Sequence, residues 1–156
     1  MIQLPVSVGI TKIKRLEKAD LAEIISLYRH LHHTDDVVDS QQLISETWDR
    51  ICARPDIAYF GLYFEDRLVS SCHIVVVPNL TRGCRSYATI ENVVTHVDYR
   101  NRGFATTLLK HVIEFAWCQK CYKVMLMTGS KKEWIYRFYE RAGFQRGVKT
   151  AFIAKQ

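Results

Sequence analysis

The chain has 156 residues, 48% of them hydrophobic and 24% charged, which is enough to build the core of one domain over residues 1–156. No stretch approaches the roughly 20 apolar residues of a membrane span, and the N-terminal sequence lacks the pattern of a secretory signal, so we expect a cytoplasmic protein without a membrane partner. The net charge of +6 divides into −3 over residues 1–99 (10 Lys+Arg, 13 Asp+Glu) and +9 over residues 100–156 (12 Lys+Arg, 3 Asp+Glu), which indicates either an anionic partner or a solvated basic face.

The first half of the chain predicts two helices followed by a β-hairpin. A short strand in "TKIKRLEKAD" leads to Asp20, a candidate N-cap, and apolar residues then recur at helical spacing. A second helix is predicted over residues 40–52, capped by Ser40. "AYFGLYF" and "RLVSSCHIVVV" flank Glu65 and Asp66 as a hairpin, "NLTRGCRS" is expected to be a loop, and "YATIENVVTHV" is a third strand.

The second half predicts two helices, each followed by a strand. A long amphipathic helix starts near Phe104, "YKVMLMT" is an apolar strand, and "KKEWIYRFYERAG" is a helix that ends at Gly143. "KTAFIAK", residues 149–155, is expected to be a final strand. The order β-α-α-β-β-β-α-β-α-β predicts an α/β fold in which helices cover a mixed sheet, with residues 87–128 forming a right-handed parallel unit.

The stretch "YRNRGFATTLL", residues 99–109, has the features of an anion site. A strand precedes it and a helix follows, so the unpaired amides of the first helical turn and the positive end of the helix dipole meet there. Gly103 allows a ligand to approach the backbone, and Arg100 and Arg102 add positive charge. The stretch lacks both the P-loop and the dinucleotide-binding signatures, and its size suits a diphosphate.

Neither the cysteines nor the histidines form a recognisable metal site, so we expect no bound metal. The five cysteines include Cys118 and Cys121 at CxxC spacing, but no second pair completes a zinc site. "HLHHTDD", residues 30–36, contains three histidines and two aspartates. Adjacent histidines on a helix point in different directions, which argues against a metal site; we expect a solvent-exposed segment or, as the family resemblance described below implies, a substrate loop.

The signature Arg100-x-x-Gly103-x-Ala105 resembles the [Q/R]-x-x-G-x-[G/A] motif of the GNAT superfamily of acyl-CoA N-acyltransferases. "IENVVTHVDY" precedes it, as the family's fourth strand does, and "RFYERAGF" is similar to the family's C-terminal "FYxxxGF". The resemblance spans residues 10–155 and implies a mixed, mostly antiparallel sheet with splayed central parallel strands. The cofactor half is especially similar to glucosamine-6-phosphate N-acetyltransferases.

This resemblance implies a binding site for acetyl-CoA, the acyl donor. In the family, pantetheine pairs with the backbone of the splayed fourth strand, and the pyrophosphate binds to the signature turn. The implied donor-binding residues are Val93, Val94, Thr95, Arg100, Asn101, Arg102, Gly103, Phe104, Ala105 and Thr106. A backbone N–H near Val94 is the implied oxyanion donor.

The resemblance also implies two catalytic residues. Tyr139 aligns with the tyrosine that protonates the departing CoA thiolate, although its helical spacing also suits a packing role. Glu91 lies on the fourth strand, where a carboxylate could accept a proton from the acceptor amine or orient it, or could pair with an arginine. Asn92 and Lys132 stand where many relatives have aspartate and asparagine, and the first difference weakens the case for the same sugar substrate.

The sequence thus predicts an N-acetyltransferase that transfers acetyl groups directly to a small-molecule amine. A protein or peptide N-acetyltransferase and a non-catalytic acyl-CoA sensor are the alternatives. A nucleic-acid partner is not expected, because the arginines lie in the cofactor turn without an accompanying nucleic-acid-binding motif. The chain could form a homodimer, as many members of the superfamily do.

Overall fold

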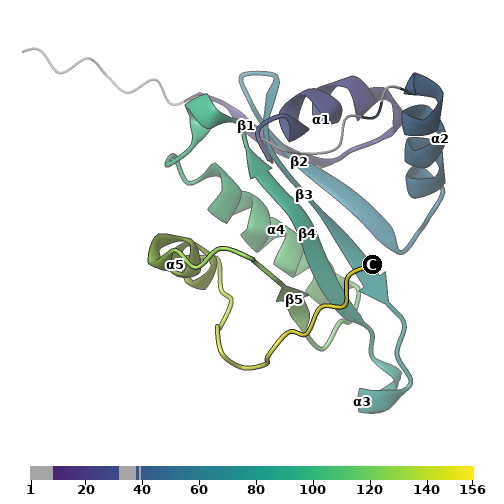
Figure 1. Cartoon of the computed structure of the whole chain (residues 1–156), viewed down its shortest axis with the longest axis vertical. Coiled ribbons are helices and arrows are strands. Elements are labelled where there is room, and N and C mark those ends of the chain that lie inside the picture. The colour runs from purple at the N-terminus through teal and green to yellow at the C-terminus, as the bar shows by residue number, and fades with distance from the viewer. Residues whose placement is uncertain (1–8, 32–37, 39) are drawn as a thin grey trace, which may run out of the picture.

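A five-stranded sheet forms the centre of the computed structural model, which describes residues 9–31, 38 and 40–156 (Figure 1). The strands lie side by side in chain order, and every neighbouring pair is antiparallel except the last, which is parallel. They are β1 (Thr11–Arg15), β2 (Ile57–Phe64), β3 (Arg67–Val77), β4 (Tyr87–Thr95) and β5 (Val124–Leu126). The predicted mixed, mostly antiparallel sheet is therefore confirmed.

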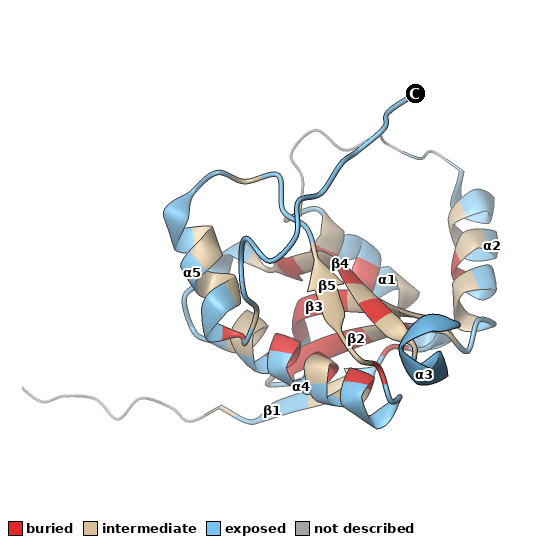
Figure 2. Ribbon diagram, turned by 90° about the horizontal axis from the view of Figure 1, so that it is seen from below, coloured by how far each residue is buried: buried red, intermediate tan, exposed pale blue. Residues whose placement is uncertain are grey.

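Helices cover both faces of this sheet. The first face carries α1 (Leu21–Tyr28), while α2 (Gln41–Cys52) stands near the β1 edge (Figure 1). The opposite face packs against α4 (Phe104–Cys118), next to which lies α5 (Glu133–Arg141). Buried residues are concentrated between the sheet and α4 (Figure 2). No helix in the described part of the chain is long and apolar enough to cross a bilayer.

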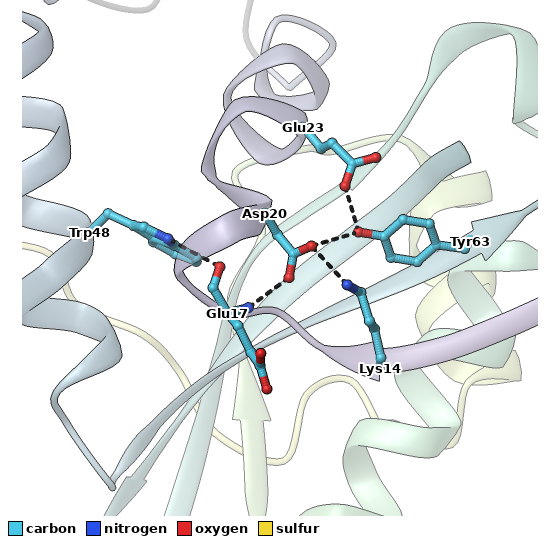
Figure 3. A network of polar contacts seen from close by, with 6 residues as sticks. All are labelled: Lys14, Glu17, Asp20, Glu23, Trp48 and Tyr63. Atoms are coloured by element: carbon cyan, nitrogen blue, oxygen red, sulfur yellow. Dashed lines mark hydrogen bonds and ion pairs between the residues drawn. The ribbon is translucent and has the colours of Figure 1, made fainter. Parts of the chain in front are cut away.

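A buried carboxylate fixes the start of α1 against the sheet (Figure 3). Asp20 is only 6% exposed and forms an ion pair with Lys14 of β1 at 2.7 Å. It also accepts hydrogen bonds from the Glu17 amide at 2.8 Å and from the Tyr63 hydroxyl at 3.3 Å. Asp20 stands at the predicted N-cap position of α1, but its side chain closes the 3-10 turn η1 (Lys18–Asp20) and makes no capping hydrogen bond to α1.

Three short sequence signals adopt the local structures predicted for them: a helix N-cap, a hairpin turn and a helix end. Ser40 caps α2 by accepting a hydrogen bond from the Leu43 amide at 3.2 Å. Glu65 and Asp66 both have positive φ, as a two-residue type I′ hairpin requires. Gly143, with a φ of 108°, ends α5 in the left-handed conformation predicted for it.

The predicted strand at residues 149–155 is wrong. No strand forms after β5, and Phe152 and Ile153 are 93% and 70% exposed. The alternating sequence supplies strand propensity, but a strand also needs a neighbour with which to form ladder hydrogen bonds. Because this strand is missing, the parallel pair β4–β5 lies at the edge of the sheet and not at its centre.

Two smaller differences concern loops. A short helix, α3 (Thr81–Cys84), forms within the predicted loop at residues 79–86, with Arg82 and Gly83 in left-handed conformations. A 3-10 turn, η2 (Val97–Tyr99), follows β4, so this strand ends two residues earlier than predicted.

Candidate functional site

β4 separates from β5 halfway along its length. Their pairing ends at Ile90, which lies opposite Leu126, the last residue of β5. β4 continues past this point to Thr95 (Figure 1). The three predicted pantetheine-pairing residues, Val93, Val94 and Thr95, lie in this continuation, where β5 no longer covers the strand's outer edge.

A β-bulge in β4 accompanies the separation. Ser71 of β3 lies opposite Val94 and His73 lies opposite Glu91, so β4 has one more residue than β3 between these pairs. Asn92, in the longer segment, has a φ of 52°. Bulges of this kind bend a strand and end its regular pairing, and they are frequent beside active sites. The bulge thus explains in physical terms why β4 leaves β5.

The residues of the predicted anion site lie at the N-terminus of α4. Gly103 is the N-cap, with a φ of 81° and open space around the position of a Cβ atom. The first intrahelical bond runs from the Thr107 amide to the Gly103 carbonyl at 2.9 Å. The amides of the first turn therefore lack intrahelical acceptors. They belong to the predicted residues Phe104, Ala105 and Thr106.

The two arginines of the signature shape this turn as well as adding charge to it. Arg100 donates from Nε to the Thr95 carbonyl at 3.1 Å and from an Nη atom to the His30 carbonyl at 2.8 Å. It thereby ties the end of α1 to the end of β4. The Arg102 guanidinium lies over the Phe64 ring, 4.5 Å from its centroid. Asn101, between the arginines, has a φ of 59° and turns the chain toward Gly103.

Tyr139 is half-buried on α5 and is held by the end of that helix. The amides of Gly143 and Phe144 bond to the carbonyls of Glu140 and Tyr139, which is the complete Schellman pattern. Burial raises the pKa of the Tyr139 phenol, and Cys72 and Glu91 raise it further. The hydroxyl therefore keeps its proton at neutral pH, and Glu91 lies close enough to influence it.

Glu91 projects toward the sheet face that carries α1, together with side chains that sequence reasoning missed. In register, Tyr59 of β2 lies opposite His73 of β3, and His73 lies opposite Glu91. Tyr28 of α1 covers the same face, with its hydroxyl buried. The available signal was a histidine within the apolar strand "RLVSSCHIVVV"; the pairing of this strand with β4 shows what His73 faces.

The histidine-rich segment makes no metal site in the described part of the chain, where no cluster of three metal-ligating side chains occurs. His30 packs against His96, with 4.0 Å between ring centroids. Residues 32–36, which contain the other histidines and the two aspartates of this segment, lie outside the described residues.

The chain is similar to known acetyltransferases over most of its length. The sequence model of the acetyltransferase (GNAT) family matches residues 20–144. A glucosamine 6-phosphate N-acetyltransferase from Trypanosoma brucei brucei is 27% identical over 142 residues, which are 86% of this chain and 88% of the relative. A structure assigned as an acetyltransferase from Agrobacterium tumefaciens str. C58 is 35% identical, with a TM-score of 0.87 over 93% of this chain and 99% of the other. The glucosamine-6-phosphate N-acetyltransferase from Arabidopsis thaliana shares the fold, at 20% identity, with a TM-score of 0.78 over 94% of this chain and 98% of the other.

Proposed function

The chain belongs to the GNAT family of acetyltransferases, and from this premise we propose that it transfers an acetyl group from acetyl-CoA directly to the primary amine of a small molecule. One observation carries the proposal: β4 leaves its parallel partner just before the turn that opens α4. The exposed strand edge and the free amides of the turn then follow one another along a single path, as a long thioester with a diphosphate requires.

The donor would lie along this path. Pantetheine would pair with the backbone of Val93, Val94 and Thr95, and the pyrophosphate would bind at the turn formed by residues 100–106. No acidic residue occurs between Asp98 and Glu114, so nothing acidic in the turn or the first half of α4 opposes the phosphate charge.

Direct transfer needs few catalytic groups. The amine attacks the thioester carbonyl, and a backbone N–H near Val94 would stabilise the resulting oxyanion, a contribution of roughly 3–4 kcal/mol for such donors. Tyr139 would protonate the CoA thiolate, for which a phenol that stays protonated is suited. Glu91 would bind the acceptor amine or accept its proton. No acyl-enzyme intermediate and no metal take part in this scheme.

The acceptor is proposed to be a small amine, since the relative from Trypanosoma brucei brucei is named for glucosamine 6-phosphate. The same sugar does not follow for this chain, because Asn92 replaces the aspartate expected beside Glu91. We retain a single domain, a cytoplasmic location and a homodimer as predictions of the same proposal.

The replacement Tyr139→Phe tests the proposed chemistry. We expect kcat to fall by about 10- to 100-fold, while the Kd of acetyl-CoA stays within about 2-fold, because only the proton donor is lost. Thiol release measures kcat, and calorimetric titration measures the Kd. The matched control is Tyr136→Phe on the same helix, which should leave both unchanged. An equal loss of donor binding and rate in Tyr139→Phe would show that Tyr139 is a packing residue.

A further inference from the structure

A row of three side chains crosses the sheet beside the proposed position of the acetyl group. It consists of Tyr59, His73 and Glu91, from the neighbouring strands β2, β3 and β4. The Tyr59 and His73 rings are stacked, with centroids 4.6 Å apart and planes 16° apart. Directly opposed residues in antiparallel strands have Cβ atoms about 4.5–5.5 Å apart. The row lies on the sheet face that carries α1, and its Glu91 end is next to the point where β4 leaves β5.

Two buried polar atoms on this face have no hydrogen-bond partner among the described residues. They are Nδ1 of His73 and the hydroxyl oxygen of Tyr28. The Tyr28 hydroxyl interacts with Asn92 and Tyr59 without the geometry of a full hydrogen bond to either, and His73 stacks on the same Tyr59. Buried polar atoms in native proteins are nearly always paired, and unpaired ones mark functional sites or missing partners. This polar spot lies next to Glu91, where the proposed function expects the acceptor.

At its Tyr59 end the row borders a cavity that opens to solvent. This cavity of about 700 Å³ lies on the same face, and Trp48, Ile51 and Tyr59 are among the residues that line it. Trp48 of α2 contacts the Tyr59 ring edge-on, with 5.0 Å between centroids. The cavity therefore borders the Tyr59 end of the row, and its lining does not include His73 or Glu91.

His73 is neutral and surrounded by neutral groups other than Glu91. Burial lowers the pKa of His73 below its ordinary value of 6.5, so its imidazole has a free lone pair at pH 7. The facing titratable groups are Tyr59 of β2, Tyr28 of α1 and Glu91 of β4, with Cys52 of α2 beyond Tyr59. Burial also raises the pKa values of both tyrosines, which stay protonated.

We propose that His73 accepts the proton that the acceptor amine must lose, and that Glu91 binds the acceptor as an ammonium. This inference rests on the proposed function, in which Glu91 either binds the acceptor amine or accepts its proton. It assigns binding to Glu91 and proton acceptance to His73. A carboxylate holds the ammonium by its charge, whereas a neutral imidazole, ordinarily a stronger base than a carboxylate, is the better proton acceptor.

The proton and electron balance closes with these groups. The acceptor R–NH₃⁺ gives one proton to the His73 imidazole, and the nitrogen lone pair of R–NH₂ attacks the carbonyl carbon of the thioester. The carbonyl π pair moves to oxygen and then returns, which breaks the C–S bond. The CoA thiolate takes the Tyr139 proton, and the second proton lost from nitrogen restores the Tyr139 phenol. The His73 imidazolium finally releases its proton to water.

Two variants of His73 separate this role from packing. His73→Gln keeps a polar side chain that does not titrate, and His73→Phe keeps a ring against Tyr59. The wild type is first screened by thiol release from acetyl-CoA with small primary amines that include glucosamine 6-phosphate, glucosamine and spermidine. With the amine that reacts fastest, both variants should lower kcat by about 100-fold or more and lose the acidic limb of the kcat–pH profile. The Kd of acetyl-CoA should not change.

Two further variants test whether Glu91 affects the KM of the amine and not the proton transfer assigned to His73. Glu91→Gln removes the negative charge that is proposed to bind the ammonium, so it should raise the KM of the amine by about 10-fold or more. It should retain the acidic limb of the kcat–pH profile. His111→Gln, a change at an exposed histidine of α4 on the opposite face of the sheet, should behave as wild type.

Three outcomes would overturn the inference in distinguishable ways. If His73→Gln retains the acidic limb and the wild-type kcat, His73 is not the base. If both variants lower only the melting temperature, the ring is a packing residue. If the wild type binds acetyl-CoA but releases no thiol with any amine of the panel, the proposed function itself fails and this inference fails with it.

Discussion

Gly103 is the residue on which the proposed donor binding depends most directly. Its φ of 81° lies in the region that favours glycine, and a Cβ atom there would meet nothing within 4 Å. The position is therefore restricted by its backbone conformation and by the space that it leaves open for a ligand, and not by packing inside the protein.

We predict that Gly103→Glu raises the Kd of acetyl-CoA by at least about 100-fold. The new carboxylate would stand at the positive end of α4, where the diphosphate is proposed to bind. Calorimetric titration measures the effect. Gly147→Glu is a matched control, because Gly147 also has a positive φ, 76°, and open space around it, but lies far along the chain from the turn. Equal losses of affinity in the two variants would contradict the assignment of the turn.

At the scale of elements, α1 is held in place by a charged network and not by its own propensity. Helix α1 has only eight residues, a length that is marginal for an isolated helix. Asp20, Lys14 and Tyr63 attach its first turn to β1 and β2 (Figure 3). Arg100 attaches the turn that follows α1 to the end of β4, by donating to the His30 and Thr95 carbonyls. The position of α1 on this face of the sheet, where the acceptor is proposed to bind, therefore depends on contacts at both ends of the helix.

We predict that Asp20→Asn lowers the free energy of unfolding at pH 7 by about 1–3 kcal/mol. Burial raises the pKa of Asp20, but the hydrogen bonds from Lys14 and the Glu17 amide and the Lys14 charge outweigh it, so the pKa is lowered from 3.8. A lowered pKa adds stability above pH 3.8 that is lost as the pH falls through the folded-state value. Urea unfolding should therefore show a smaller difference between variant and wild type at pH 3 than at pH 7.

The exposed pair of Arg54 and Asp56 provides the comparison for this experiment. Its shortest contact is 2.6 Å, but both side chains reach solvent, so Asp56→Asn should destabilise much less than Asp20→Asn. If the two variants lose equal stability at pH 7, the Asp20 network does not hold α1 as described.

The sequence predicts elements best where their signals are local. Ser40, Gly143 and the pair Glu65–Asp66 act on their immediate neighbours, and the structure shows each in its expected role. Residues 149–155 have equally good local alternation, but a strand depends on a partner that no local pattern specifies. The row of Tyr59, His73 and Glu91 could not be predicted for the same reason, because only the pairing registers of β2, β3 and β4 place these residues together.

In the candidate site, too, features set by consecutive residues could be predicted and features set by contacts between distant elements could not. Residues 100–106 could be predicted because strand, basic turn, glycine and helix are consecutive in the sequence. The positive φ of Asn92 could not be predicted, because asparagine adopts many conformations and the bulge arises from the pairing of β4 with β3. Similarly, the sequence shows the charge of Arg100 but not its two carbonyl partners, which come from separate elements.

Across the whole molecule, the charge distribution matches the proposed path of the donor. The segment from residue 100 onward has a balance of +9, and it begins at the turn proposed to bind the diphosphate. The segment before it has a balance of −3 and supplies most of the acceptor face, including Glu91. β4 ends at Thr95, shortly before the basic segment begins, so the two substrates would meet near the boundary between these two segments.

The measurement that tests this account most directly is calorimetric titration of the purified protein with acetyl-CoA, with dephospho-CoA and ATP as comparisons. The account predicts a micromolar Kd for acetyl-CoA, which corresponds to about −8 kcal/mol, and weaker binding of both comparison ligands. Absence of acetyl-CoA binding, or binding of ATP with equal affinity, would contradict the proposed donor site and the transfer reaction that depends on it.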